Sequence, residues 1–179
     1  MMRLLNLFRH DGGAAAAEMV MVLPFLLVLL FGSAELGNYF LDDHGLLKQV
    51  RDGARYASRL PLEANYTCPN TVAPTAETLI ENVVKTGTVD GTGLGRFDTG
   101  YWGRACSGVA QPITVTIRCV PEGDYGGIYS SLDGDIPVVK VSAAIGYRSV
   151  LGSLGLPTAD LCLRAESESA VIGSCGCSS

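Results

Sequence analysis

The stretch that decides the fold is AAAAEMVMVLPFLLVLLFGSAELG, residues 14–37. It carries no charge between Met19 and Phe31. At about 1.5 Å rise per residue, a helix over residues 14–34 is about 30 Å long, which is the thickness of the hydrocarbon core of a bilayer. The ten Val, Leu and Phe residues from Val20 onward in this run together favour insertion by roughly 3–6 kcal/mol. We therefore predict a transmembrane helix over residues 14–34.

Glu18 is an acid inside this apolar segment. The free energy of inserting this acid is unfavourable by about 2.5–3.5 kcal/mol at the bilayer centre and by less near the interface. The apolar residues outweigh it, so the segment still inserts. An ionisable residue in a membrane span is a functional candidate that needs a partner. A cut after Gly13 would create one, the α-amino group of Ala14, four residues from Glu18. In the alternative, Glu18 only stabilises the helix N-terminus through the helix dipole.

The sequence around Glu18 carries a family resemblance. The stretch GGAAAAEMVMVLP is similar to the processing region of prepilins. Together with QVRDGARYASR, residues 49–59, it resembles the TadE-like family of minor pseudopilins from tight-adherence (Flp pilus) systems. The resemblance is good over residues 9–59 and looser at VSAAIGYRSVLGSLGLP and LCLRAESES, near the C-terminus.

The resemblance implies a role for each matching position. Gly13 would precede the bond cut by a prepilin peptidase, Ala14 would be the mature N-terminus, and Glu18 would assist processing or assembly. Pro24 would be the proline inside the helix, and Glu35 the acid at its outer end. The implied partners are the membrane, the prepilin peptidase, other pilins or pseudopilins and the assembly-platform proteins of the inner membrane. No cofactor is implied.

A secretory signal peptide is the competing interpretation of the same segment. Gly32, Ser33 and Ala34 are small residues at the end of an apolar run, as at an ordinary signal-peptide cleavage site. A cut there would release a secreted, disulfide-bonded binding protein that begins at Glu35. The proline in the middle of the apolar stretch and the length of the leader argue against this alternative.

Charge counting does not decide the orientation. Arg3 and Arg9 precede the span, and Lys48 and Arg51 follow it, so the positive charges on the two sides tie. The proximity of Arg9 to the helix, and the need of the cysteines for an oxidising side, place the N-terminus in the cytoplasm of a bacterial inner-membrane protein. The predicted organisation is a leader over 1–13, a span over 14–34, a periplasmic helical extension over 35–60 and a periplasmic α+β domain over 61–179.

Six cysteines follow the span, an even number on one side of the membrane. They include no Cys-x-x-Cys pair, and neither histidine is near them in the sequence, so disulfides are favoured over metal ligands. The sequence does not choose among the possible pairings, although a bridge across a one-residue gap would be strained. The candidates are Cys68, Cys106, Cys119, Cys162, Cys175 and Cys177.

An apolar stripe at spacings of three, four or seven predicts that the helix continues from Leu36 to Ser58. Gly45 and Gly53 cost about 1 kcal/mol each relative to alanine, so this part of the helix should depend on a partner surface. Pro61 is the predicted end of the helix. The stripe consists of Leu36, Phe40, Leu47, Val50, Ala54 and Ala57.

The rest of the chain predicts one more helix and a sheet. Thr75–Lys85 has the pattern of a short amphipathic helix, and Thr86–Ser107 is rich in Gly and Thr, which favours loops and leaves room for a hairpin. Strict alternation over residues 113–119, 139–147 and 161–168 predicts strands. We expect an α+β fold with a long helix packed on a small antiparallel sheet, the pseudopilin-like arrangement that the resemblance also implies.

Several functions are disfavoured. A net charge of -5 without a Lys/Arg stripe argues against a nucleic-acid partner. The GTGLG stretch at residues 91–95 lacks the Lys-Ser/Thr of a phosphate loop, and Asp133-Gly134-Asp135 lacks the spacing of a calcium loop. Two isolated histidines support no Ser-His or Cys-His pair. We expect a structural assembly protein without enzymatic activity, cofactor or metal.

Overall fold

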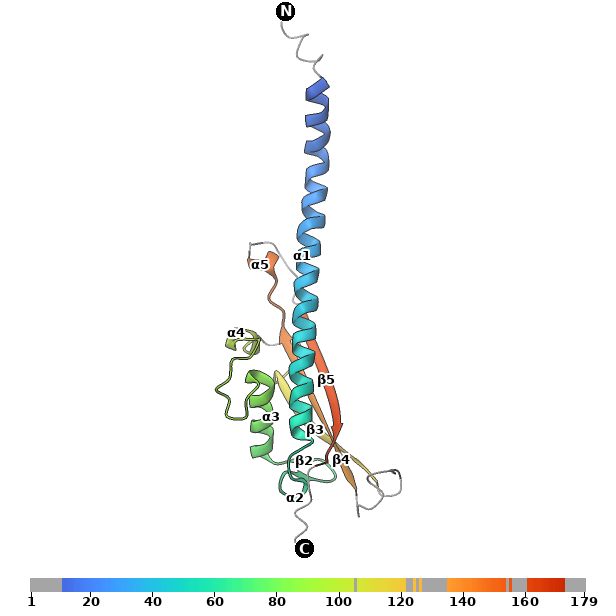
Figure 1. Ribbon diagram of the computed structural model, residues 1–179, viewed down its shortest axis with the longest axis vertical. Helices are drawn as coiled ribbons and strands as arrows, with labels where there is room; N and C mark the ends of the chain where they lie inside the picture. The colour runs from blue at the N-terminus through green and yellow to red at the C-terminus, as the bar shows by residue number, and fades with distance from the viewer. Residues whose placement is uncertain are drawn as a thin grey trace, which may run out of the picture.

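The structure is a computed structural model that describes residues 11–104, 106–121, 124, 126, 135–153, 155 and 161–172. One long helix, α1 (Asp11–Ala57), forms the axis of the molecule and continues through Pro24. Its C-terminal half lies in a small domain, while its N-terminal half stands free of that domain (Figure 1). The predicted continuity of the helix from the apolar segment into the domain is confirmed.

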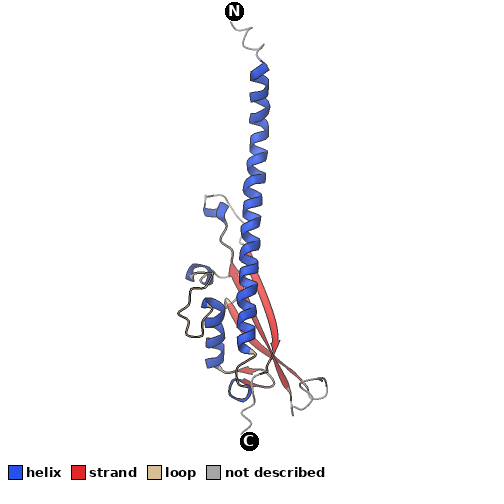
Figure 2. Cartoon of the chain, in the orientation of Figure 1, coloured by secondary structure: helices blue, strands red, loops and turns tan. Residues whose placement is uncertain are grey.

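Three antiparallel strands form the main sheet in the order β3 (Ile113–Val120), β4 (Ile136–Gly146) and β5 (Cys162–Ala170). The register places Val115 opposite Val141, and Val141 opposite Ser167. The odd-numbered residues of β4 are buried, as are residues 113, 115 and 117 of β3, whereas residues 114, 116 and 118 of β3 are exposed. The alternation that predicted these strands therefore separates a core face from a solvated face. The expected α+β fold is confirmed (Figure 2).

Helix α3 (Pro74–Thr86) packs beside α1 over the core face of the sheet (Figure 1). It begins with proline in its first turn and ends at Gly87, whose φ of 77° is the left-handed conformation that glycine adopts readily. Its buried residues and those of α1 belong to one core with the inner strand residues. The helix residues in this core are Leu46, Val50, Ala54, Ala57, Ile80 and Val84.

Shorter elements complete the domain. Among the described residues these are a two-stranded ladder and three single-turn helices, which connect the larger elements. They are α2 (Leu62–Asn65), β1 (Tyr66–Thr67), β2 (Thr71–Val72), α4 (Thr99–Trp102) and α5 (Val150–Ser153).

Two disulfides fasten the domain, as expected from the even cysteine count. Cys68 bonds to Cys119, which joins the β1–β2 turn to the end of β3. Cys106 bonds to Cys162, which joins the segment before β3 to the first residue of β5. Cys175 and Cys177 lie outside the described residues, so the expectation that they take part in disulfides stays a prediction.

α1 ends at Ala57, one residue before the predicted Ser58. The predicted apolar stripe on this helix was wrong in part. The buried stripe starts at Leu46 in place of Leu47. Leu36 and Phe40 are 56% and 51% exposed, because the domain contacts the other side of α1 there, at Glu35, Asn38 and Tyr39. The described residues between Thr86 and Ser107 are loops apart from the single-turn helix α4 (Thr99–Trp102), as predicted, and the hairpin that the sequence left open is not among them. Gly95 packs against the Lys85 carbonyl.

Candidate functional site: the bare segment of α1 and its exit from the domain

The N-terminal half of α1 is a bare apolar helix, which we call the bare segment (residues 16–34). Val20, Phe25 and Leu29 are each about 70% exposed, and no residue in the most apolar window of this helix is buried by the domain. Leucine, valine and phenylalanine cover all sides of the segment, which is typical of a helix surrounded by lipid or by other apolar helices. The helix is long and apolar enough to cross a membrane.

The predicted processing residues lie near the start of this helix. Gly13, Ala14 and Glu18 all have helical backbone, and the Glu18 side chain is exposed. Residues four apart lie on the same face of an α-helix, so an α-amino group on Ala14 would be on the face of Glu18. The helical backbone at positions 14 and 18 thus has the spacing that the pairing hypothesis requires, and the pairing itself stays a prediction. It brings no other charged side chain of the described domain near them, because the bare segment stands free.

Glu35 marks the place where α1 enters the domain. Its carboxylate oxygen Oε2 accepts a hydrogen bond from the backbone amide of Leu151 at 3.1 Å, at the first turn of α5. The hydroxyl of Tyr147 donates to the backbone carbonyl of Glu35 at 3.3 Å and accepts from Asn38 Nδ2 at 3.0 Å. The ring of Tyr39 stacks edge-on against Tyr147 with centroids 5.2 Å apart. These contacts hold the segment that follows β4 against α1, at the level where the helix leaves the domain.

The ionised form of Glu35 is favoured at this site. Burial opposes ionisation, but hydrogen bonds from Ser149, Tyr147 and the backbone of residues 150–151 outweigh it and hold the pKa of the Glu35 carboxyl below its ordinary value. The other carboxylate oxygen, Oε1, is buried without a hydrogen-bond partner. The acid expected at the outer end of the helix is therefore an anchoring group of the domain.

A second acid of α1, Asp42, is 5% exposed and anchors the loop after α3. Its carboxylate accepts a hydrogen bond from Arg96 Nη2 at 2.9 Å and another from the Tyr101 hydroxyl at 3.3 Å. Burial of Tyr101, reinforced by the charge of Asp42, raises the pKa of the tyrosine. Gly45 makes room for Arg96, because a Cβ at Gly45 would overlap the arginine side chain.

Sequence reasoning missed Asp42, because the apolar stripe predicted for this helix gives no sign that an acid would be buried beside it. The available signal was Gly45 one turn later, since a small residue next to a buried acid leaves space for a long cationic partner. Arg96 itself lies in a Gly-rich stretch without periodicity, so its sequence position gave no indication that it would face α1.

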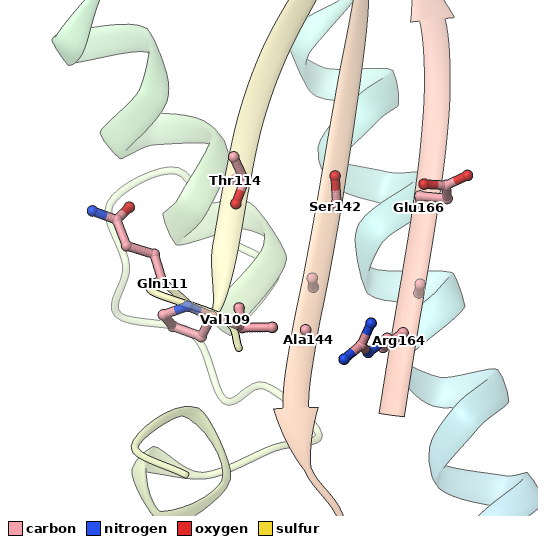
Figure 3. A pocket seen from close by; sticks show the side chains of 10 residues that line it. Val109, Gln111, Thr114, Ser142, Ala144, Arg164 and Glu166 are labelled. Atoms are coloured by element: carbon pink, nitrogen blue, oxygen red, sulfur yellow. The ribbon is translucent and has the colours of Figure 1, made fainter. Parts of the chain in front are cut away.

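The solvated face of the sheet holds a shallow depression of about 460 Å³ (Figure 3). Thr114, Ser142 and Glu166 form one row across the three strands, and Arg164 lies beside Ala144 in the next row. Lys140 pairs with Glu166 at 2.7 Å across the strands. The described lining contains an acid, a cation and hydroxyl groups, and it includes no histidine or cysteine.

The described residues include no cluster of three or more His, Cys, Asp or Glu side chains that could hold a metal ion. The buried Asp42 and the partly buried Glu35 of α1 both accept hydrogen bonds from the domain itself.

The fold and the bare segment together define a class of protein, a small α+β domain carried on one long helix that is apolar enough to cross a membrane. Residues 13–55 match the family model described as TadE-like protein, a match that covers nearly all of α1. It confirms the resemblance and relates the chain to the tight-adherence (Flp pilus) system. No curated protein and no solved structure matches the chain significantly.

Proposed function

We propose that this chain is a minor pseudopilin, a structural or assembly component of a Flp-type pilus or tight-adherence secretion apparatus, and that it has no enzymatic activity. One observation carries the proposal. The helix matched by the family, α1, is at once a bare apolar segment and the central helix of the domain core. A subunit built in this way can be held in a membrane by one half of the helix and present a folded domain with the other.

Cleavage between Gly13 and Ala14 by a prepilin peptidase is the processing step that we propose. The cut would leave an α-amino group at the start of α1, four residues from Glu18. A cation and a carboxylate in an apolar environment attract each other strongly when they are paired, and each is costly when it is alone. The amine therefore supplies the partner that Glu18 otherwise lacks, in its own chain or in a neighbouring subunit.

The proposed topology is a single-pass inner-membrane protein with residues 1–13 in the cytoplasm and the domain in the periplasm. The two disulfides support this orientation, because disulfides persist in the periplasm and are rare in the cytoplasm. The proposed partners are the prepilin peptidase, other pilins or pseudopilins whose apolar helices would pack on the bare segment, and inner-membrane assembly-platform proteins.

The mature N-terminus tests this proposal. The full chain is produced in bacteria with and without a prepilin peptidase of a tight-adherence system, and its N-terminal peptide is identified by mass spectrometry. We expect a start at Ala14 only when the peptidase is present. Gly13→Leu should abolish the cut, and Gly12→Ala is the matched control that should leave it intact.

A secreted binding protein is the second candidate, favoured by the small residues Gly32, Ser33 and Ala34 and by the disulfide-bonded domain. It requires a signal-peptidase cut after Ala34, which would leave the domain soluble with Glu35 as its first residue. A mature protein that starts at Glu35 and leaves the membrane fraction would establish this candidate and overturn the pseudopilin proposal.

A further inference from the structure

Exposed apolar side chains gather where α1 leaves the domain. Outside the bare segment, eight large apolar residues of the described chain are at least 40% exposed. Five of them lie at this one level, and we call them the exit ring. The exit ring consists of Leu36, Phe40, Leu41, Val150 and Leu161, with exposed fractions of 56%, 51%, 63%, 50% and 47%.

Hydrogen bonds fix the members of the exit ring at one height along α1. Leu36 to Leu41 follow the bare segment directly and extend about 9 Å along the axis at 1.5 Å per residue. Val150 adjoins Leu151, whose amide bonds to Glu35 at 3.1 Å. Leu161 is held level with them because its carbonyl accepts from the amide of Tyr147 at 2.8 Å, and the Tyr147 hydroxyl reaches the Glu35 carbonyl.

The exit ring faces several directions around the axis. Leu36 and Leu41 are five residues apart, which places them about 140° apart around the helix. Val150 and Leu161 lie on the domain side, on α5 and just before β5 (Figure 1). A protein partner covers one side of a helix, whereas a lipid layer meets every side at a given height. The distribution therefore favours a lipid surface.

Polar groups around the exit ring have the arrangement of a membrane interface. Arg148, two residues before Val150, is half exposed and only loosely paired with Asp98 at 3.5 Å. Arginine beside apolar residues can reach lipid phosphates while its stem stays in apolar surroundings. The half-buried ring of Tyr39 lies at the same level, where aromatic residues are enriched in membrane proteins, and it packs on the buried ring of Tyr147. The carboxylate of Glu35 accepts a hydrogen bond from the backbone of the domain.

We infer that the exit ring is a second membrane contact, which lies in the headgroup interface of the leaflet on the domain side. That interface is about 5–8 Å thick, close to the height that the α1 residues of the ring cover. The domain is thus seated on the lipid surface with α5 against it, at a fixed height. This inference rests on the proposed membrane span and adds the surface by which the domain meets the lipid.

Depth-dependent quenching of tryptophan fluorescence tests the contact. The chain has one tryptophan, Trp102, so Trp102→Phe supplies a silent background that keeps an aromatic ring against Phe97. Tryptophan is then introduced one site at a time at Val150 in the exit ring, at Leu29 in the bare segment and at Val89 as the control. Val89 is 40% exposed and lies after α3, beside helix residues that pack near Gly53 of α1 and so far from the membrane.

The full-length variants are reconstituted into vesicles of zwitterionic and anionic phospholipids that carry bromine either near the headgroup or deep in the acyl chains. We expect Val150→Trp to lose emission most strongly with bromine near the headgroup, Leu29→Trp with deep bromine, and Val89→Trp with neither. If brominated lipid quenches Val150→Trp no more than Val89→Trp while it quenches Leu29→Trp, the second contact is overturned and the span stands.

Two other results are also decisive. An unquenched Leu29→Trp would contradict the proposed span itself, and with it this inference. A blue-shifted Val150→Trp that resists bromine and changes with protein concentration would mean that a second copy of the chain covers the ring, which also overturns the lipid contact.

Discussion

Gly53 of α1 lies directly against Val84 of α3, so closely that a Cβ at Gly53 would overlap a methyl group of the valine. Both residues are buried in the core that the two helices share. The glycine that weakens α1 as an isolated helix is therefore the residue that lets α3 approach it. The sequence-based expectation that this part of α1 depends on a partner surface is confirmed at this contact.

Replacement of Gly53 by alanine should destabilise the domain although alanine is the better helix former. Overpacking of a core costs about 1–3 kcal/mol, which exceeds the gain of about 1 kcal/mol from helix propensity. Chemical denaturation of the protein in detergent, followed by circular dichroism, measures the change. Gly37→Ala is the matched control, because nothing lies within 4 Å of a Cβ at Gly37, and it should be neutral or stabilising. Recovery of stability in Gly53→Ala/Val84→Ala relative to the sum of the single variants would identify the overlap as the cause.

Asp42→Asn should loosen the loop that carries Arg96 and Tyr101. Hydrogen bonds to a charged group contribute about 1.5–3 kcal/mol, and the exposed part of Arg96 places the expected loss at the low end of that range. The same denaturation measurement reports it, together with increased hydrogen exchange in residues 96–101. Asp43→Asn removes the same charge one residue later, and it should change the free energy of unfolding by less than about 0.5 kcal/mol. Equal effects of the two variants would contradict the anchoring role of Asp42.

The contact between Glu35 and Leu151 should be lost in acid. Because the pKa of Glu35 is lowered in the folded state, its contribution is present above the unfolded pKa and disappears as the pH falls through the folded pKa. Hydrogen-exchange protection of the Leu151 amide, corrected for the intrinsic rate, should therefore fall on acidification. In Glu35→Gln the protection should be lower at neutral pH and should vary less with pH. Glu63→Gln, an exposed acid on α2, should behave as wild type.

Removal of either disulfide should destabilise the domain to a similar extent. The bridges close loops of 51 and 56 residues, for which the chain-entropy estimate is about 4 kcal/mol each. Cys68→Ser/Cys119→Ser and Cys106→Ser/Cys162→Ser separate them, with unfolding monitored as above. Peptide mapping under non-reducing conditions should recover the two linked peptide pairs, and recovery of Cys68 linked to Cys106 or Cys162 would contradict the observed pairing.

Glu18→Ala should leave membrane insertion intact, because removal of a charge from the bare segment only favours partition into lipid. Processing after Gly13 or assembly into a fibre should fail, and assembly should fail because the α-amino group that the cut creates on Ala14 has lost its partner. Membrane fractionation, the mass of the N-terminal peptide and electron microscopy of pili measure the three steps. Met19→Ala is the control at the next position. Normal pili in Glu18→Ala would remove the proposed role of this acid.

Helices and strands could be predicted from the sequence where one face of the segment packs against another helix or strand and the other face does not. Strict alternation located β3 and β4, because the solvated face of the sheet leaves polar residues at every second position. The free half of α1 was predictable because its apolar residues lie on all sides. The phase of the buried stripe on α1 was not, because Leu46 and Leu47 are equally apolar, and only the position of α3 and the sheet decides which of them is covered.

Residues of the candidate site could be predicted only where the membrane span or the family resemblance singles out a residue type. Glu18 was identified because an acid in an apolar span is unusual, and Glu35 through the resemblance. The anchoring pairs Asp42–Arg96 and Glu35–Leu151 connect residues 54 and 116 positions apart, in segments that have no periodicity of their own. Such contacts depend on how the loops close over the helix, which sequence patterns do not specify.

The continuity of α1 through residues 34–35 also has a mechanical consequence. The part of the helix that would sit among lipids or neighbouring subunits and the part that fills the core are one rod without a hinge between them. Tension on the outer end would therefore reach β4, β5 and α3 directly as shear along the packed face of α1. A subunit of this kind would resist extraction with the strength of its whole core, and its domain would tilt only when the rod tilts.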